Sequence, residues 1–354
     1  MTTAAPEREK TLAPKARDPY FSNAKFALIV LVVIGHAWAP IRGDSNSVHA
    51  FYITLYAFHM PAFILLSGYF SKTFTARPDQ LRRVLTGILA PYLIFSILYE
   101  VLQYFTDENE GTILLDPYYL LWFLAALFVW RMTCPLWRLI RQPFLVALLI
   151  SMGALVLDLP GTFDVGRILQ FLPFFVAGMH MKREHFEMLR RPLVRVVGLA
   201  ASLAILAAAF FFGGELEADW VKYTDGAEQL DVTVWEALPV RLTLMIAAGV
   251  LMATFLAWIP QRQLPTTRLG DMTMYPFLLH GFFVKLANHT WEWYDLPAVN
   301  TGAGAIGVTV LSVALTLVLC TPPVRWLTRP VVEPKLNWIL RKEEERRKPR
   351  PYPS

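Results

Sequence analysis

Two residues of the first long apolar stretch have types and a spacing that could support chemistry inside a membrane. Lys25 precedes an almost unbroken run of apolar residues, and His36 follows its end. Eleven positions are about three helical turns, so both side chains lie on one face, about 16 Å apart along the axis. An imidazole in hydrocarbon needs a partner or a function. Neutral imidazole can take a proton from a hydroxyl or attack an acyl group.

Two further histidines, His59 and His280, also stand near the middle of long apolar stretches. The three imidazoles could converge on one cavity, where we expect His36 to be catalytic and the other two to contact the substrate. The alternative for each is a structural histidine that is hydrogen-bonded between helices. No metal site is expected, because no acidic or cysteine partner has the spacing of metal ligands.

Basic residues gather near one mouth of the expected helices. Lys25, Arg82 and Arg83 could bind the phosphates of a nucleotide-bearing cofactor, although such clusters usually only set orientation in the membrane. The chain has no Gly-rich phosphate loop, so binding would depend on side chains. Ser67 and Gly68 end another apolar stretch, where small residues permit close approach of a helix or a ligand.

Charged residues near the opposite mouth are fewer. Arg167 and Arg241 each begin an apolar stretch there, and Glu100 lies late in another. Because misplaced charges are costly in a membrane, we expect these side chains to pair or to line a polar cavity for the substrate. Asp44 follows the first stretch and could bind substrate or orient a histidine. The alternative is an ordinary exposed loop residue with no role in a site.

The elements that must position these residues are apolar helices. The 354 residues are 55% hydrophobic and 17% charged, whereas soluble domains have about 25% charged residues. This composition excludes a soluble globular domain and predicts an all-α, polytopic transmembrane bundle of about ten spans. Nucleic acid is not expected as a partner, because the basic residues are confined to loops between apolar runs. The expected spans are 23–41, 49–70, 82–105, 117–137, 142–157, 167–181, 193–212, 239–259, 271–288 and 302–322.

The distribution of basic residues predicts the orientation of these spans. With a cytoplasmic N-terminus, 28 of the 33 Lys and Arg residues lie on the cytoplasmic side. Residues 1–22 are then a cytosolic tail, 23–322 a transmembrane domain with an extracytoplasmic loop at 213–239, and 323–354 a charged cytosolic tail. We expect a multi-pass protein of a bacterial-type cell membrane with both termini in the cytoplasm.

Several motifs occur in an order and spacing that resemble one family of membrane enzymes. They are Lys25 with His36, FHMPAFILLSGYF (58–70), Arg82 and Arg83 with Pro91 and Tyr92, LWFLAALFVWR (121–131), FLPFFVAGM (171–179) and MYPFLLH (274–280). Together they are similar to the integral-membrane acyltransferase-3 family, in particular to its fucose 4-O-acetylase-like branch. The family usually has arginine at the position of Lys25, and lysine lacks the planar fork for bidentate phosphate contact.

The resemblance implies an O-acyltransferase that moves an acetyl group from cytosolic acetyl-CoA to a hydroxyl of a carbohydrate or glycosylated acceptor. Trp122 and Arg131 would shape the cofactor side. His36 would act as general base, or it would form an acetyl-imidazole intermediate, and both routes stay open. Another acyl group, such as succinyl, is not excluded by the resemblance.

Two other functions are compatible with the same residues. A proton-coupled transporter or flippase of a polar or lipid-linked solute would use the histidines as a proton relay. The lack of an obvious internal repeat argues against an inverted-repeat transporter. A membrane scaffold without catalysis would leave the shared face of Lys25 and His36 unexplained.

Overall fold

The computed structural model describes residues 18–43, 45–106, 116–157, 159 and 162–340. Within these ranges the chain is helical and has no strand. Six stretches are long and apolar enough to cross a membrane. They are Pro19–Trp38 (α1), Asn46–Ser71 (α2), Pro78–Phe105 (α3, η1 and α4), Pro192–Phe212 (α10), Val234–Trp258 (α12) and Gly302–Leu319 (α14). The prediction of an all-α polytopic membrane protein is confirmed.

The other four expected spans are also helical, but they are shorter. Three of them are α5 (Trp122–Trp137), α6 (Pro143–Val156) and α13 (Met274–His289). The stretch expected at 167–181 is divided into α7 (Val165–Gln170) and α8 (Leu172–His180). Pro173 lies in the first turn of α8, where its missing N–H needs no partner, and this favours a new helix start over a continuous helix. The number of ten membrane crossings stays a prediction.

The stretch Pro78–Phe105 consists of α3 (Pro78–Val84), the π-helical turn η1 (Leu85–Leu89) and α4 (Ala90–Phe105). The remaining elements are short: η2 (Thr162–Asp164), α9 (Arg183–Leu189), η3 (Gly213–Glu215), α11 (Ala218–Lys222), η4 (Thr267–Asp271), η5 (Trp293–Asp295) and α15 (Pro322–Val332).

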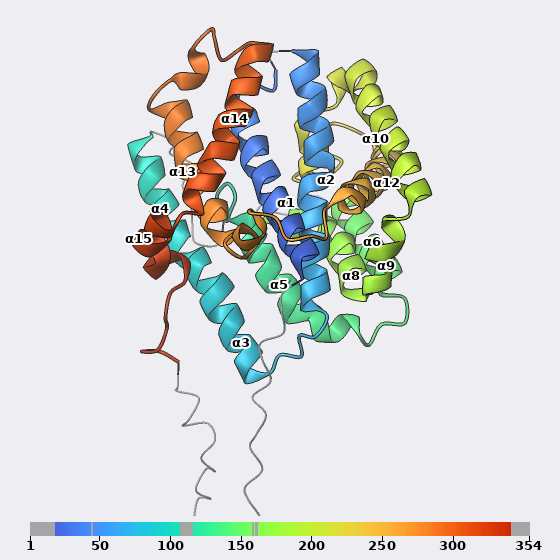
Figure 1. Cartoon of the computed structure of the whole chain (residues 1–354). Helices are drawn as coiled ribbons and strands as arrows, with labels where there is room; N and C mark the ends of the chain where they lie inside the picture. The colour runs from blue at the N-terminus through green and yellow to red at the C-terminus, as the bar shows by residue number, and fades with distance from the viewer. Residues whose placement is uncertain (1–17, 44, 107–115, 158, 160–161, 341–354) are drawn as a thin grey trace, which may run out of the picture.

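Helix α1 is enclosed by other parts of the bundle (Figure 1). It contacts α2, α13, α14 and η4. Asp18 caps its start by accepting a hydrogen bond from the N–H of Tyr20 at 3.0 Å, and Pro19 occupies the first turn. Leu28 and Ile29 are fully buried. A polar side chain on the faces of α1 that meet α2 and α13 therefore contacts protein and not lipid.

Glycines permit the close packing of α2 and α8. A Cβ atom at Gly68 of α2 would collide with the carbonyl of Phe175, and one at Gly178 of α8 would collide with the carbonyl of Leu65. Such reciprocal small residues let two helix backbones approach closely. Gly68 is thus explained by contact with a helix, one of the two roles expected for it.

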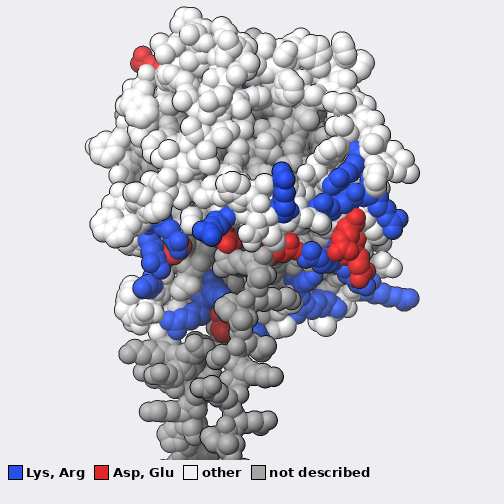
Figure 2. Space-filling model, in the orientation of Figure 1, with Lys and Arg blue, Asp and Glu red and all other residues white. Residues whose placement is uncertain are grey.

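Charged side chains gather at one end of the molecule. Figure 2 shows Lys and Arg side chains, with some Asp and Glu among them, in the lower part of this face, below a broad surface almost without charged side chains. We call this end the basic end, and its residues include Lys25, Lys72, Arg82, Arg138 and Arg183. Arg138 donates to the carbonyl of Lys72 at 2.7 Å, which ties the ends of α5 and α2 together here.

At the other end, residues 213–233 form a structured cap that contains η3 and α11. Three hydrogen bonds fasten it: Arg167 Nε to the carbonyl of Lys222 at 3.0 Å, Gln170 Nε2 to that of Asp225 at 3.2 Å, and Ala227 N to that of Leu155 at 2.8 Å. Helix α12 begins at Val234, so the last part of the loop expected at 213–239 is helical.

Candidate active site

The structure brings His36 and His280 into direct contact, although 244 positions separate them. His36 projects from α1 and His280 from α13. Nδ1 of His36 lies 2.8 Å from Nε2 of His280, and the two rings are nearly parallel, with an interplanar angle of 18° and centroids 5.0 Å apart. His280 is fully buried and His36 is half-buried. Two of the predicted site residues therefore form one unit within the bundle.

The hydrogen-bond network assigns the proton positions of this pair. Nδ1 of His280 lies 2.6 Å from the carbonyl oxygen of Pro276, and a carbonyl can only accept, so this nitrogen carries the proton. In a neutral imidazole the other nitrogen is then an acceptor, so Nε2 of His280 accepts from Nδ1–H of His36. The assignment leaves Nε2 of His36 with its lone pair. That nitrogen can act as a base or as a nucleophile.

We call the hydrogen-bonded chain of His36, His280 and the Pro276 carbonyl the relay. It resembles the hydrogen-bonded chain of a catalytic triad, but all its members are neutral. In a Ser-His-Asp triad the third group holds the histidine in the correct tautomer. Here His280 holds His36, and the main-chain carbonyl of Pro276 holds His280. His280, expected to contact the substrate, is hydrogen-bonded to His36 in the structure, and its contact with substrate stays a prediction.

His59 lies on α2 and follows the same tautomer rule. Its Nδ1 is 2.7 Å from the carbonyl of Leu55, so this nitrogen is the donor. Its Nε2 is buried and has no hydrogen-bond partner among the described residues. The ring of Tyr56 contacts His59 edge-on, with centroids 4.8 Å apart. A buried acceptor of this kind suits a donor group such as a hydroxyl.

Aromatic residues surround His36. The ring of Tyr119 lies 4.8 Å from the His36 ring. Tyr119 also has a φ of +54°, an uncommon backbone conformation that often occurs at functional sites. Tyr56 packs beside Gly35, where an added Cβ would lie 3.1 Å from its ring. Sequence reasoning missed Tyr56 and Tyr119, and the only local signal for Tyr119 was a tyrosine pair just before the LWFL motif.

Arg167 and Trp122 lie together near the cap. The guanidinium carbon of Arg167 is 3.9 Å from the centre of the Trp122 ring, a cation–π contact. Its side chain is 14% exposed and also pairs with Asp164 at 3.5 Å. Burial raises the pKa of the Asp164 carboxyl, and Arg167 opposes that effect. Trp122 was expected on the cofactor side, but it contacts Arg167, which was expected on the acceptor side.

The remaining acceptor-side predictions have different surroundings. Arg241 is fully buried and donates from Nη1 to the carbonyl of Trp220, so it also holds the cap. Its guanidinium lies 4.2 Å from the ring of Tyr223. Glu100 is exposed on α4. Asp44 lies outside the described residues.

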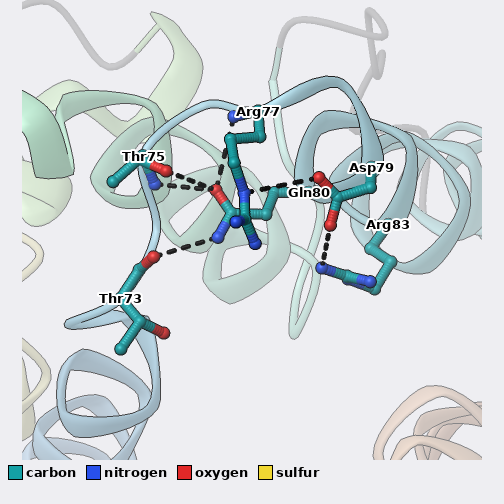
Figure 3. A network of polar contacts seen from close by, with 6 residues as sticks. All are labelled: Thr73, Thr75, Arg77, Asp79, Gln80 and Arg83. Atoms are coloured by element: carbon teal, nitrogen blue, oxygen red, sulfur yellow. Dashed lines mark hydrogen bonds and ion pairs between the residues drawn. The ribbon is translucent and has the colours of Figure 1, made fainter. Parts of the chain in front are cut away.

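Lys25 lines a pocket of about 630 Å³ at the basic end, which we call the basic-end pocket. Its ammonium lies 3.4 Å from a carboxylate oxygen of Asp271. Arg82 and Arg83 do not line this pocket. Arg82 donates to Asn337 at 2.9 Å, and Arg83 donates to Asp79 at 2.8 Å (Figure 3). The three basic residues expected at one mouth are thus not brought together.

The other residues expected on the cofactor side lie near the basic end of α2. Arg131 donates from Nε to the hydroxyl of Ser71 at 3.1 Å. The hydroxyl of Ser67 donates to the carbonyl of Phe63 at 2.9 Å, within its own helix. Neither Ser67 nor Gly68 lines the basic-end pocket, whereas the two following residues, Tyr69 and Phe70, do.

The described part of the chain contains no group of three or more His, Cys, Asp or Glu side chains that could hold a metal ion.

Comparison with known proteins places the chain among membrane acyltransferases. Residues 18–322 match the Acyltransferase domain model of the acyltransferase-3 family. Nodulation protein NolL of Sinorhizobium fredii (strain NBRC 101917 / NGR234) is 25% identical in an alignment 351 residues long. The alignment covers 89% of this chain and 92% of that protein. No solved structure is significantly similar to the chain. Because the matched region covers most of the sequence and includes His36 and His280, the chain belongs to the acyltransferase-3 family of membrane-embedded acyltransferases.

Proposed function

We propose that this acyltransferase moves an acetyl group from acetyl-CoA to a hydroxyl group of a carbohydrate or glycosylated acceptor. The observation that carries the proposal is the oriented pair of His36 and His280, which leaves Nε2 of His36 with a lone pair inside an apolar bundle. The sequence resemblance to the fucose 4-O-acetylase-like branch favours acetyl-CoA as donor and a sugar as acceptor.

In direct transfer, Nε2 of His36 takes the proton of the acceptor hydroxyl while the hydroxyl oxygen attacks the acetyl carbonyl. The carbon–sulfur bond then breaks, and CoA leaves as the thiol after receiving the proton from the imidazolium. In the stepwise route, the same nitrogen attacks the carbonyl and the carbon–sulfur bond breaks, so that CoA leaves as the thiolate. The hydroxyl oxygen then displaces the imidazole from the acetyl group, and the hydroxyl proton passes to the thiolate. His280 holds the ring in the required orientation in both routes.

The positions of Lys25 and His36 on one helix support entry of the donor from the basic end. Lys25 lines the basic-end pocket, and His36 lies about 16 Å further along α1. A phosphate at Lys25 would leave the thioester arm pointing along α1 towards His36. We propose that the basic end faces the cytoplasm of a bacterial-type cell, as the distribution of Lys and Arg favours, and that the acceptor approaches from the side of the cap.

Release of CoA from acetyl-CoA tests this function. The purified full chain in detergent should release free CoA thiol from acetyl-CoA, slowly to water and faster when a suitable sugar is added. The release should require an intact His36, because the imidazole supplies the base. The measurement is a thiol assay on the wild type, on a His36→Gln variant and on a reaction without protein.

A protein that folds and binds CoA but releases no thiol above the reaction without protein would contradict an acetyltransferase. If it instead moved a solute across proteoliposomes in response to a pH gradient, the proton-coupled transporter would be the better interpretation.

A further inference from the structure

The basic-end pocket holds two cations, each of which is already paired with a carboxylate. Its walls come from the start of α1, the end of α2, the start of α9 and the η4 region. Lys25 Nζ lies 3.4 Å from Asp271, and Arg183 is hydrogen-bonded to Asp18 and, through Nε, to Glu187 at 3.2 Å. Lys25, Asp271, Arg183 and Asp18 line the pocket, and Glu187 does not. Arg183 was not among the residues that the sequence suggested.

These ion pairs are held only weakly by their surroundings. The side chains of Lys25 and Asp271 are 28% and 30% exposed, and that of Arg183 is 55% exposed. Ion pairs that water can reach contribute little net free energy, because solvation and screening offset the attraction. An anion that binds Lys25 and Arg183 more strongly could therefore replace the two carboxylates.

The backbone under Asp271 is firmly placed, so an exchange would involve mainly its side chain. Gly270 packs so closely on α1 that an added Cβ would collide with the backbone of Ser22. The hydroxyl of Thr267, also in η4, donates to Asn23 at 2.6 Å. These contacts hold η4 against α1.

The other wall of the pocket is aromatic. Phe21 and Tyr69 are stacked with centroids 4.9 Å apart, and Phe70 contacts both. All three line the pocket. Phe21 and Tyr69 are buried, whereas Phe70 is 45% exposed. A planar base can therefore stack on the ring of Phe70, while phosphates prefer the cations nearby. The pocket thus combines the two features that a nucleotide requires.

We propose that Lys25 and Arg183 bind phosphate groups of the donor nucleotide, and that these phosphates displace Asp271 and Asp18. This inference rests on the proposed use of acetyl-CoA and adds a binding residue, Arg183, and a carboxylate exchange. Asp18 and Asp271 keep the two cations at the pocket between turnovers and compete with the donor for them. This carboxylate exchange sets the affinity for the nucleotide without altering the histidines.

The test is the affinity of CoA for the full chain, measured by titration calorimetry in detergent at low ionic strength. Asp271→Asn and Asp18→Asn should each bind CoA about two- to fivefold more tightly than the wild type, because a competing exposed ion pair is removed. Lys25→Gln and Arg183→Gln should each weaken binding about tenfold, as expected for a lost charged contact. In the Lys25→Gln background, Asp271→Asn should give no further gain.

Asp79→Asn is the matched control. It removes the same charge from the same end, where Asp79 pairs with Arg77 and Arg83 outside the pocket (Figure 3). Its affinity for CoA should equal that of the wild type. An equal gain in Asp79→Asn, or weaker binding in Asp271→Asn, would overturn the exchange while leaving the donor intact. Failure of every variant and of the wild type to bind CoA would overturn the proposed donor as well.

Discussion

His36→Gln should reduce acyl transfer by about 10²- to 10⁴-fold, the contribution typical of a positioned general base. Glutamine retains hydrogen-bonding atoms but has no basic nitrogen, so it can neither take the hydroxyl proton nor carry an acetyl group. Donor affinity should change little, because the basic-end pocket lies about three helical turns away on α1. The measurement is the turnover of acetyl-CoA together with the affinity for CoA.

His59→Gln is the matched comparison for this substitution. The glutamine can still donate to the carbonyl that His59 uses, that of Leu55, and the relay between His36 and His280 is untouched. We expect a smaller loss of activity than for His36→Gln. A folded His36→Gln protein with near-wild-type transfer would refute the role of His36, whatever the family membership suggests.

His280→Met should lower turnover on the order of 10²-fold with a small effect on CoA affinity, because methionine gives His36 Nδ1–H no comparable acceptor and the tautomer is no longer held. In triads whose orienting group is a carboxylate, loss of the correct tautomer costs about 10⁴-fold. A smaller loss is expected here, because a neutral imidazole stabilises the developing imidazolium less than a carboxylate does. The measurement is turnover of acetyl-CoA at saturating donor.

His280→Gln distinguishes orientation from packing. Its amide oxygen can accept the proton of His36 Nδ1, so it should recover part of the activity lost in His280→Met. A variant that only disturbed the packing of α13 would show no such difference. Equal activity of His280→Met and the wild type would mean that His280 does not orient His36.

The long helices of this protein could be predicted because each follows from a local pattern of apolar residues. Apolar runs near 20 residues long indicated the spans, and the shorter stretch at 167–181 is divided at Phe171. The shared face of Lys25 and His36 followed from helical spacing alone. These inferences need only residues within one helix.

The contacts of the site could not be predicted in the same way, because they join distant segments. The pairing of His36 with His280 depends on how α1 and α13 cross, and the role of the Pro276 carbonyl depends on a side-chain rotamer. Arg183 reaches the basic-end pocket because α9 folds back to the start of α1. Tyr119 has no periodic signal, since it lies in a connection before α5 and not in a helix.

Charge alone also could not distinguish ligands from structural cations. Lys25 and Arg183 line a pocket, whereas Arg82 and Arg83 are held by polar groups elsewhere at the same end. Arg241 resembled a substrate residue in the sequence, and in the structure it holds the cap through the carbonyl of Trp220. Their position relative to the basic-end pocket, and not their charge, separates these cations.

The proton on the imidazole of His36 can be located directly by nitrogen NMR of the full chain in lipid, with ¹⁵N-labelled histidine. The His36→Gln and His280→Met variants assign the two rings by the loss of their signals. We expect both rings to be neutral at neutral pH, each with its proton on Nδ1. Nε2 of His36 should be unprotonated and should accept a hydrogen bond from an added acceptor hydroxyl. A His36 ring with its proton on Nε2 would contradict the relay, because no lone pair would then face the reacting groups.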